Sequence, residues 1–241
     1  MKEKVTVIAG GSSGIGISVV KKFLKKGDRV IVVDINKIAD DAIIKDDKYL
    51  FFKADITNPD DITSVKKKIE KKFKKIDNLI SIAGISMKSE IGGIEMVTID
   101  DIDKSIKLNL NSHIYLIKIF LDLFEKRGTT KNIMMVSSTN AISCYGLPVY
   151  SSAKAGLLSF MKAVTGDLSS RGIRINTISL GIVPHCTDFN GRNDYLELKG
   201  DKTSLNEFVK PTDVADTIYN LAYKMKAIVG QNIVLDVGQN L

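Results

Sequence analysis

Short apolar runs alternate with amphipathic stretches along the whole chain. The apolar runs are nearly continuous and rich in β-branched residues, which is typical of strands buried on both faces of a sheet. Between them, apolar side chains recur every three to four residues, as on the buried face of a helix. We predict strands at Val5–Ala9, Arg29–Asp34, Tyr49–Asp55, Asn78–Gly84, Asn132–Ser138, Arg174–Leu180 and Asn232–Asp236, and helices at Gly14–Lys26, Pro59–Lys75, Asp103–Arg127, Val149–Ser170 and Asp213–Tyr223.

This regular alternation of strands and helices predicts an α/β fold. Parallel strands need crossover connections, usually helices, and such helices cover both faces of the sheet. The chain has 241 residues and no repeat or low-complexity linker, so we expect one doubly wound, Rossmann-type domain over residues 1–241 with a seven-stranded, mostly parallel sheet. Sheets of this kind bind ligands beyond the carboxyl ends of their strands.

The stretch Asp103–Arg127 is apolar on more than one side. A single stripe packed against the sheet cannot use all of these side chains. We therefore expect the outer side to be buried in a homo-oligomer, either a dimer or a tetramer. The apolar residues are Leu108, Leu110, Ile114, Tyr115, Leu116, Ile117, Ile119, Phe120, Leu121, Leu123 and Phe124.

The charge of the chain leaves an anionic partner open, because 35 Lys and Arg face 28 Asp and Glu, a formal net charge of +7. The densest lysine cluster lies within residues 66–75, where Val65, Ile69 and Phe73 recur at helical spacing. These lysines then form the solvated side of an amphipathic helix. No aromatic residues interleave with them on that side, as nucleic-acid binding would favour. We expect no nucleic-acid partner.

Composition also bears on location and on metal binding. Hydrophobic residues make up 44% and charged residues 26%, which allows a sizeable core and argues against a disordered chain. No apolar stretch approaches the roughly 20 residues of a membrane span, and the first residues lack the features of a signal peptide. Cys144 and Cys186 are too few for a disulfide framework or a thiolate metal site. We expect a cytoplasmic protein without a membrane or metal partner.

Residues 10–16, with the sequence Gly-Gly-Ser-Ser-Gly-Ile-Gly, follow the first predicted strand and open the first predicted helix. Glycines let the backbone approach a phosphate closely, and a helix N-terminus offers free N–H groups and a positive dipole end. In this position the loop predicts a site for a dinucleotide pyrophosphate, although a tight strand-to-helix turn alone also favours glycine.

Acidic and small residues end the next strands. Asp34 lies about 18 residues beyond the glycine loop, where a carboxylate can bind the adenosine ribose hydroxyls. It would repel a 2′-phosphate, and the loop holds no Lys or Arg to compensate, so we expect NAD(H) to be preferred with NADP(H) possible. Without the glycine loop, a solvated strand end would explain Asp34 equally well. Asp55 either accepts a hydrogen bond from the adenine amine or forms a turn after its strand. The small residues Ala83–Gly84 leave room for the nicotinamide ribose.

Tyr150 and Lys154 are four residues apart, and therefore lie one turn apart on one face of a predicted helix. A nearby ammonium stabilises tyrosinate, so we expect Lys154 to lower the pKa of Tyr150 toward a value useful for acid–base chemistry. Ser138 ends the fifth predicted strand and would point its hydroxyl at the substrate oxygen in the same cleft. Together these residues predict a proton-transfer site.

These motifs, in this order and spacing, resemble those of the short-chain dehydrogenases/reductases, in their compact branch, over the whole chain. The resemblance implies that Tyr150 is the general acid or base and that Ser138 anchors the substrate oxygen. It further implies that Lys154 also binds the nicotinamide ribose and that Asn109 holds a water linking Lys154 to solvent. The residues predicted to contact the cofactor are Gly10, Ser12, Ser13, Gly14, Ile15, Gly16, Asp34, Ile35, Asp55, Ile56, Ala83, Gly84, Tyr150, Lys154 and Val183.

The chain departs from the family pattern at several positions. Ala9 stands where threonine commonly opens the glycine motif, and Ser81–Ile82 stand where two asparagines are usual. His185 falls at or near the position of a threonine that often contacts the nicotinamide amide. Ser138 lies one position closer to the tyrosine than is familiar in the family, so Ser137 is the alternative anchor; the strand pattern favours Ser138.

Substrate specificity in this family resides in the loops after the fifth and sixth strands, here Thr139–Val149 and about 182–210. The first loop is fairly apolar and the second mixes aromatic with charged residues, which suits a polar alcohol or ketone as well as an acyl chain. We expect an NAD(H)-dependent oxidoreductase that interconverts a small-molecule secondary alcohol and a ketone. The alternative is an NADPH-dependent 3-oxoacyl-[acyl-carrier-protein] reductase, against which Asp34 argues. A non-catalytic dinucleotide-binding regulatory protein is a further alternative.

Overall fold

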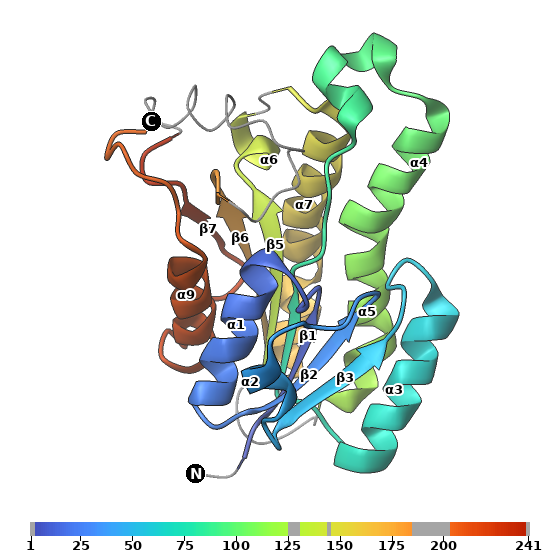
Figure 1. The fold of residues 1–241 in the computed structure, drawn as a ribbon, viewed down its shortest axis with the longest axis vertical. Helices are drawn as coiled ribbons and strands as arrows, with labels where there is room; N and C mark the ends of the chain where they lie inside the picture. The colour runs from blue at the N-terminus through green and yellow to red at the C-terminus, as the bar shows by residue number, and fades with distance from the viewer. Residues whose placement is uncertain (1–2, 125–130, 144–145, 185–202, 240–241) are drawn as a thin grey trace.

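The computed structural model describes residues 3–124, 131–143, 146–184 and 203–239. Within these ranges the strands form one seven-stranded sheet in the order β3-β2-β1-β4-β5-β6-β7, with every neighbouring pair parallel (Figure 1). The predicted doubly wound α/β fold is confirmed, and the sheet is parallel throughout. The strands are β1 Val5–Ala9, β2 Arg29–Asp34, β3 Tyr49–Lys53, β4 Asn78–Ser81, β5 Lys131–Ser138, β6 Ile173–Leu180 and β7 Asn232–Leu235.

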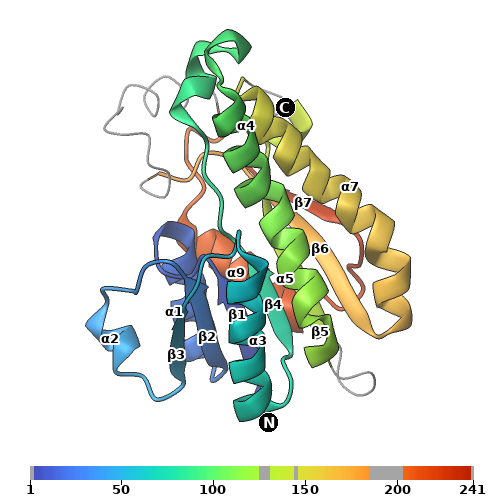
Figure 2. The same ribbon diagram turned by 90° about the vertical axis from the view of Figure 1, so that its right-hand side faces the viewer.

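Helices cover both faces of the sheet (Figures 1 and 2). Side chains of α3, α5 and α7 pack into one apolar core, and those of α1 and α9 pack into a second core on the opposite face. The strands supply both cores alternately, so Val7 and Ala9 face the first core and Ile8 faces the second. The helices are α1 Gly14–Lys25, α2 Asp41–Ile44, α3 Pro59–Phe73, α4 Ile99–Ile106, α5 Ser112–Phe120, α6 Asn140–Ser143, α7 Pro148–Ser170 and α9 Pro211–Tyr223.

The predicted helix Asp103–Arg127 is wrong in its bounds and in its continuity. Helix α4 begins earlier, because the hydroxyl of Thr98 caps it by accepting a hydrogen bond from the backbone N–H of Asp101 at 3.1 Å. A π-helical turn, Lys107–Asn111, separates α4 from α5, and a 3-10 turn, Leu121–Leu123, follows α5. Residues 125–127 lie outside the described ranges.

Part of the apolar surface of α5 and its neighbouring turns is not fully buried against the sheet, as the sequence predicts. Six of these apolar side chains are half-buried in the single chain, whereas their neighbours are fully buried in the core. Their burial by a second copy of the chain stays a prediction. The half-buried residues are Leu108, Leu110, Ile114, Tyr115, Ile119 and Leu121.

Three strands end earlier than predicted: β7 stops at Leu235 rather than Asp236, and β3 and β4 end early at the edge where the sheet meets a cavity. Strand β3 stops at Lys53 rather than Asp55, and β4 stops at Ser81 rather than Gly84. The residues released from β3 and β4 line the cavity described below. Helices α2 and α6 were not predicted, because each is a single turn and too short to show a helical period.

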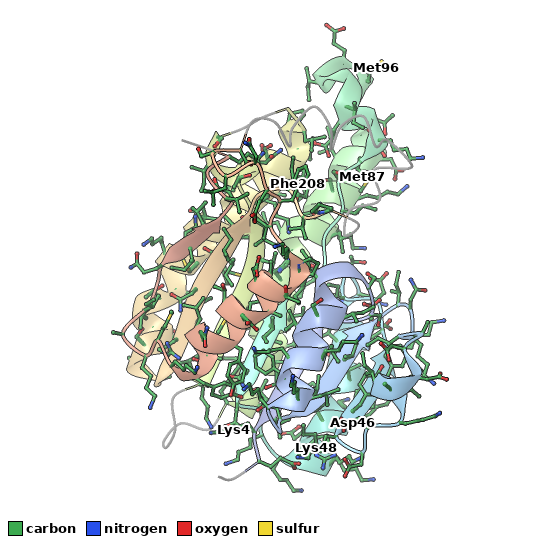
Figure 3. All side chains as sticks on the ribbon, turned by 60° about the vertical axis from the view of Figure 1, so that its left-hand side comes forward. Lys4, Asp46, Lys48, Met87, Met96 and Phe208 are labelled. Atoms are coloured by element: carbon green, nitrogen blue, oxygen red, sulfur yellow. The ribbon has the colours of Figure 1, made fainter. Side chains whose placement is uncertain are left out.

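Between β4 and α4 the chain makes two 3-10 turns, Lys88–Gly92 and Ile94–Met96. They project beyond the carboxyl ends of the strands, with Met96 near the tip and Met87 closer to the sheet (Figure 3). This projecting segment therefore overhangs the edge where ligands bind in parallel sheets.

A row of buried polar side chains crosses the opposite end of the sheet. Asn78 donates through Nδ2 to the hydroxyl of Thr6 at 2.8 Å, and Asn132 donates through Nδ2 to Oδ1 of Asn78 at 2.7 Å. The guanidinium of Arg174 donates to Oδ1 of Asn132 and to backbone carbonyls at the end of α9. The row links four neighbouring strands to this helix.

Candidate active site

A cavity of about 760 Å³ lies at the carboxyl ends of the strands. Its size is within the range of small-molecule and cofactor sites. It brings together most of the residues that the sequence assigned to a cofactor or to catalysis. They come from the ends of strands, from the segments that follow the strands, and from helix α7. These residues are Gly10, Ser13, Gly14, Ile15, Gly16, Asp34, Ile35, Asp55, Ile56, Ala83, Gly84, Ser138, Tyr150, Lys154 and Val183.

The glycine loop forms one wall of this cavity, and its backbone requires glycine at two positions. Gly10 has a φ of +81°, and a Cβ there would lie 2.6 Å from the backbone nitrogen of Ala83. A Cβ on Gly16 would lie 2.1 Å from the carbonyl oxygen of Gly10. Helix α1 starts at Gly14 with no side-chain cap and no acidic residue in its first turn. Its free N–H groups therefore suit an anion such as a pyrophosphate.

Asp34 is held in a fixed orientation at the end of β2. Its Oδ2 accepts a hydrogen bond from the backbone N–H of Ser12 at 3.0 Å, and its Oδ1 accepts one from that of Asn36 at 3.1 Å. Ser12 is itself buried and does not line the cavity, so in this structure it orients Asp34. The carboxylate that faces the cavity is suited to hold ribose hydroxyls.

The two candidate serines at the end of β5 face different ways, because alternate residues of a strand do so. The hydroxyl of Ser137 is buried and donates to the carbonyl of Lys154 at 3.0 Å. The hydroxyl of Ser138 lies beside the cavity, where it shares a hydrogen bond with the side chain of Tyr150. The geometry favours Ser138 as the residue that meets a substrate.

Lys154 lies one turn after Tyr150 on α7 and is only 2% exposed. Its Nζ donates to the carbonyl of Val136 at 3.0 Å and lies 5.7 Å from the centre of the Tyr150 ring. Burial lowers the pKa of Lys154 to about 7. The ammonium can therefore lose its proton near neutral pH.

The pKa of Tyr150 is raised in this structure, whereas the sequence predicts that it is lowered. In this structure burial, and then the negative charge of Glu90, raise the pKa of Tyr150 to about 12, against the hydrogen bond from Ser138 that lowers it. Lys154 turns its Nζ toward Val136, and its charge does not offset these causes. The hydroxyl of Tyr150 is therefore protonated at neutral pH.

Asn109 stands behind the cavity wall instead of lining it. Its Oδ1 accepts from the backbone N–H of Ile85 at 3.0 Å, and its Nδ2 donates to the carbonyls of Ile85 at 2.8 Å and Ser105 at 3.0 Å. A Cβ on Gly84 would lie 2.8 Å from both Oδ1 of Asn109 and Nζ of Lys154. Glycine at this position lets the two side chains approach each other, and the water relay through Asn109 stays a prediction.

Two buried groups beside the site are not among the predicted site residues. Glu90, in the projecting segment, accepts hydrogen bonds from the start of α7. His113 is fully buried and donates from Nε2 to the carbonyl of Ala83 at 3.0 Å; burial lowers its pKa to about 3. His113 is thus a neutral packing residue, and it supports the loop after β4 from behind.

Some predictions fall outside the described residues, namely those on Cys144, His185, Cys186 and most of the substrate loop 182–210. Among the described residues, no three or more His, Cys, Asp or Glu side chains are grouped to hold a metal ion. In the same part of the chain, no helix has the length and apolarity needed to cross a membrane.

Comparisons with known sequences match almost the whole chain. The profile of the family described as Enoyl-(Acyl carrier protein) reductase matches residues 9–240. Short-chain dehydrogenase reductase 3b of Arabidopsis thaliana is 28% identical over 249 residues, which cover 99% of this chain and 96% of that protein. The 3-oxoacyl-[acyl-carrier-protein] reductase FabG of Thermotoga maritima is 28% identical over 247 residues, covering 99% and 98%.

Solved structures share the same fold. A short-chain dehydrogenase from Leptospira borgpetersenii with bound NAD+ superposes with a TM-score of 0.90 at 27% identity, covering 100% of this chain and 94% of that one. The 3-ketoacyl-(acyl-carrier-protein) reductase from Brucella melitensis, complexed with NADH, has a TM-score of 0.88 at 26% identity, covering 99% and 98%.

Proposed function

Because the chain belongs to the short-chain dehydrogenase/reductase family, we propose that it interconverts a secondary alcohol and a ketone with NAD(H) as its cofactor. Family membership makes it an NAD(P)-dependent oxidoreductase; the preference for NAD(H) and the substrate class are the proposal. One observation carries it: the side chains of Ser138, Tyr150 and Lys154 meet at a cavity whose other wall is the glycine loop.

Each of these residues has a role that its environment supports. Tyr150 transfers the proton to or from the substrate oxygen, since its hydroxyl is hydrogen-bonded to Ser138 beside the cavity. Ser138 holds the same oxygen as charge develops on it. Lys154 sits next to the Tyr150 ring with a proton that it can release near neutral pH, and it binds the nicotinamide ribose. The cofactor supplies or accepts the hydride.

The remaining predicted contacts divide the cavity between the parts of the cofactor. The free N–H groups at the start of α1 bind the pyrophosphate, and Ser13 and Ile15 contact it there. Asp34 and Ile35 bind the adenosine ribose, and Asp55 and Ile56 bind the adenine. Gly84 and Val183 leave space beside the nicotinamide ribose and ring.

Asp34 supports the choice of NAD(H), because its fixed carboxylate would repel a 2′-phosphate. Two of the similar structures hold NAD+ and NADH. We expect a larger rise in Tm with NADH than with NADPH at matched concentrations. A ligand at 100 times its Kd stabilises a protein by about 2.7 kcal/mol, which corresponds to roughly 5 to 11 °C for a chain of this size.

The Asp34→Ser variant tests the cause of this selectivity. Its Tm should respond less to NADH and more to NADPH than that of the wild type. Asp60→Ser is a matched control, because Asp60 is an exposed residue in the first turn of α3 and does not line the cavity. A wild type that responds more strongly to NADPH would overturn the proposed cofactor preference.

Turnover is tested with a panel of secondary alcohols, including sugar derivatives and hydroxy acids, by the appearance of NADH absorbance. The Tyr150→Phe variant should lose turnover by roughly 10²- to 10⁴-fold while it keeps the thermal response to NADH. Tyr49→Phe is the matched control, because the Tyr49 hydroxyl is buried in β3 without a hydrogen-bond partner in the described part of the chain. Equal losses in both variants would contradict the role of Tyr150.

A second candidate function is an NADPH-dependent 3-oxoacyl-[acyl-carrier-protein] reductase. The similarity to reductases of this name, over 93% or more of their length in several bacteria, favours it. Acetoacetyl-coenzyme A reduction with NADPH, faster than any alcohol oxidation with NAD, would make it the better proposal. Cofactor binding without turnover on either substrate class would instead support a regulatory dinucleotide-binding protein.

A further inference from the structure

Glu90 is a buried carboxylate whose main hydrogen-bond partners lie far from it in sequence. It lies in the 3-10 turn Lys88–Gly92 of the projecting segment and is 2% exposed. Its Oε2 accepts hydrogen bonds from the backbone N–H groups of Val149 at 2.9 Å and Tyr150 at 2.8 Å. Its Oε1 accepts a longer one, of 3.4 Å, from the N–H of Met87. The carboxylate therefore joins the projecting segment to the first turn of α7.

Helix α7 has no cap of its own at this end. Leu147 occupies the cap position with φ 49° and ψ 62°, and its side chain has no oxygen to accept a hydrogen bond. Pro148 follows and has no N–H. The first two N–H groups that need a partner are those of Val149 and Tyr150, and Glu90 accepts from both. A carboxylate is favourable here, because the helix dipole is positive at its N-terminus.

The charge of Glu90 also reaches the side chain of Tyr150. After burial, this charge is what raises the pKa of Tyr150. Other charged groups on the elements around the tyrosine are Lys154 on α7, and Lys104 and Lys107 beside the same cavity. Asp34 and Asp55 stand at the ends of β2 and β3, beyond β1 and β4 from the tyrosine.

We propose that Glu90 is a positioning residue of the active site: its carboxylate caps α7, fixes the backbone of Tyr150 and places a negative charge beside this residue. The inference rests on the proposed role of Tyr150 as the acid or base. The protonated tyrosine is the form that gives its proton to a ketone oxygen.

Two conservative variants separate the charge of Glu90 from its hydrogen bonds. Glu90→Gln removes the charge but keeps a carbonyl oxygen that can accept from Val149 and Tyr150. Glu90→Asp keeps the charge but is one methylene shorter, so it reaches these N–H groups poorly. Glu95→Gln is the control, because Glu95 is exposed in the same segment and its loss changes the net charge equally.

The ionisation of Tyr150 is read from the Cζ resonance of ¹³C-labelled tyrosine, assigned by its absence in Tyr150→Phe. At pH 11, a pKa of about 12 leaves about a tenth of Tyr150 ionised, and a lower pKa would raise this fraction. We expect the larger fraction in Glu90→Gln and the smaller one in wild type, Glu90→Asp and Glu95→Gln. An unchanged fraction in Glu90→Gln would overturn the role of the charge.

Hydrogen exchange of the Val149 and Tyr150 amides reads the cap separately. Exchange should be about tenfold or more faster in Glu90→Asp, and close to wild type in Glu90→Gln and Glu95→Gln. Wild-type exchange in Glu90→Asp would overturn the capping role. Because neither measurement needs a substrate, both remain decisive if the Tyr150→Phe experiment refutes the proposed function. With a substrate in hand, the pH profile of kcat should move to lower pH in Glu90→Gln alone.

Discussion

Arg174 is expected to be the most sensitive link between the sheet and α9. Its side chain lies at the end of the polar row and is 5% exposed. The guanidinium donates to Oδ1 of Asn132, to the carbonyls of Leu221 at 2.8 Å and Ala222 at 3.0 Å, and to two further carbonyls after the helix. Leu221 and Ala222 lie in the last turn of α9, where carbonyls lack partners within the helix.

The substitution Arg174→Met keeps much of the apolar stem and removes every donor. Met225 and Ile228, the two further carbonyls, each retain another hydrogen bond. Oδ1 of Asn132 and the carbonyls of Leu221 and Ala222 would be left without the partner they have here. A buried acceptor left unsatisfied costs about 1–3 kcal/mol. Some relaxation toward water reduces the sum, so we expect a loss of roughly 3 to 5 kcal/mol.

Thermal unfolding followed by circular dichroism measures this loss. At about 2–4 °C per kcal/mol for a chain of this size, Tm should fall by roughly 6 to 20 °C. The Tm of Arg174→Lys, which keeps the charge but fewer donors, should lie between those of the wild type and Arg174→Met. This variant replaces Arg174→Met in the test if the methionine variant does not fold. Arg29→Met is the matched control, because Arg29 pairs with Glu3 at the surface and should lose at most about 1 kcal/mol. Equal falls for Arg174→Met and Arg29→Met would refute the reasoning.

Two other substitutions test one residue that lines the cavity, Gly84, and one that lies behind it, His113. Gly84→Ala puts a Cβ 2.8 Å from Nζ of Lys154, so kcat should fall by roughly 10- to 100-fold with an unchanged circular dichroism spectrum; Gly166→Ala, in open space on α7, should leave kcat unaltered. Burial lowers the pKa of His113 from 6.5 to about 3, so this residue contributes stability above pH 6.5 that is lost as pH falls toward 3. Urea unfolding of His113→Asn should therefore show a flatter dependence on pH, the difference reaching about 1.4 kcal/mol per pH unit, and parallel curves for variant and wild type would contradict this.

The strands could be predicted because a sheet covered on both faces needs continuous apolar runs. The bounds of β1 and β2 match the prediction, since the apolar run of β1 stops before Gly10 and that of β2 stops at Asp34. The helix Asp103–Arg127 was mispredicted for a different reason. Its apolar residues continue through the π-helical and 3-10 turns that interrupt it, and such changes in backbone hydrogen bonding leave no mark on hydrophobic periodicity.

The residues of the candidate site also fall into two groups, those that the sequence reveals and those that only the structure reveals. The glycine loop, Asp34, Tyr150 and Lys154 could be recognised because each is a local motif or the end of a strand. The choice between Ser137 and Ser138 needed the structure, which shows the alternation of side chains along β5 directly. Glu90 could not be found, since its partners lie 59 and 60 residues away and the turn that carries it has no periodic pattern.

The protonation of Tyr150 illustrates why local spacing is an incomplete guide to chemistry. The sequence supplies one charged neighbour, Lys154, and so favours a lowered pKa. The fold adds burial and the charge of Glu90, both of which raise the pKa of Tyr150. With Lys154 titrating near pH 7, the site by itself holds a protonated tyrosine suited to donate a proton to a ketone. If oxidised nicotinamide were bound in this cavity, its positive charge would favour the deprotonated tyrosine, so the two directions of the reaction should differ in their dependence on pH.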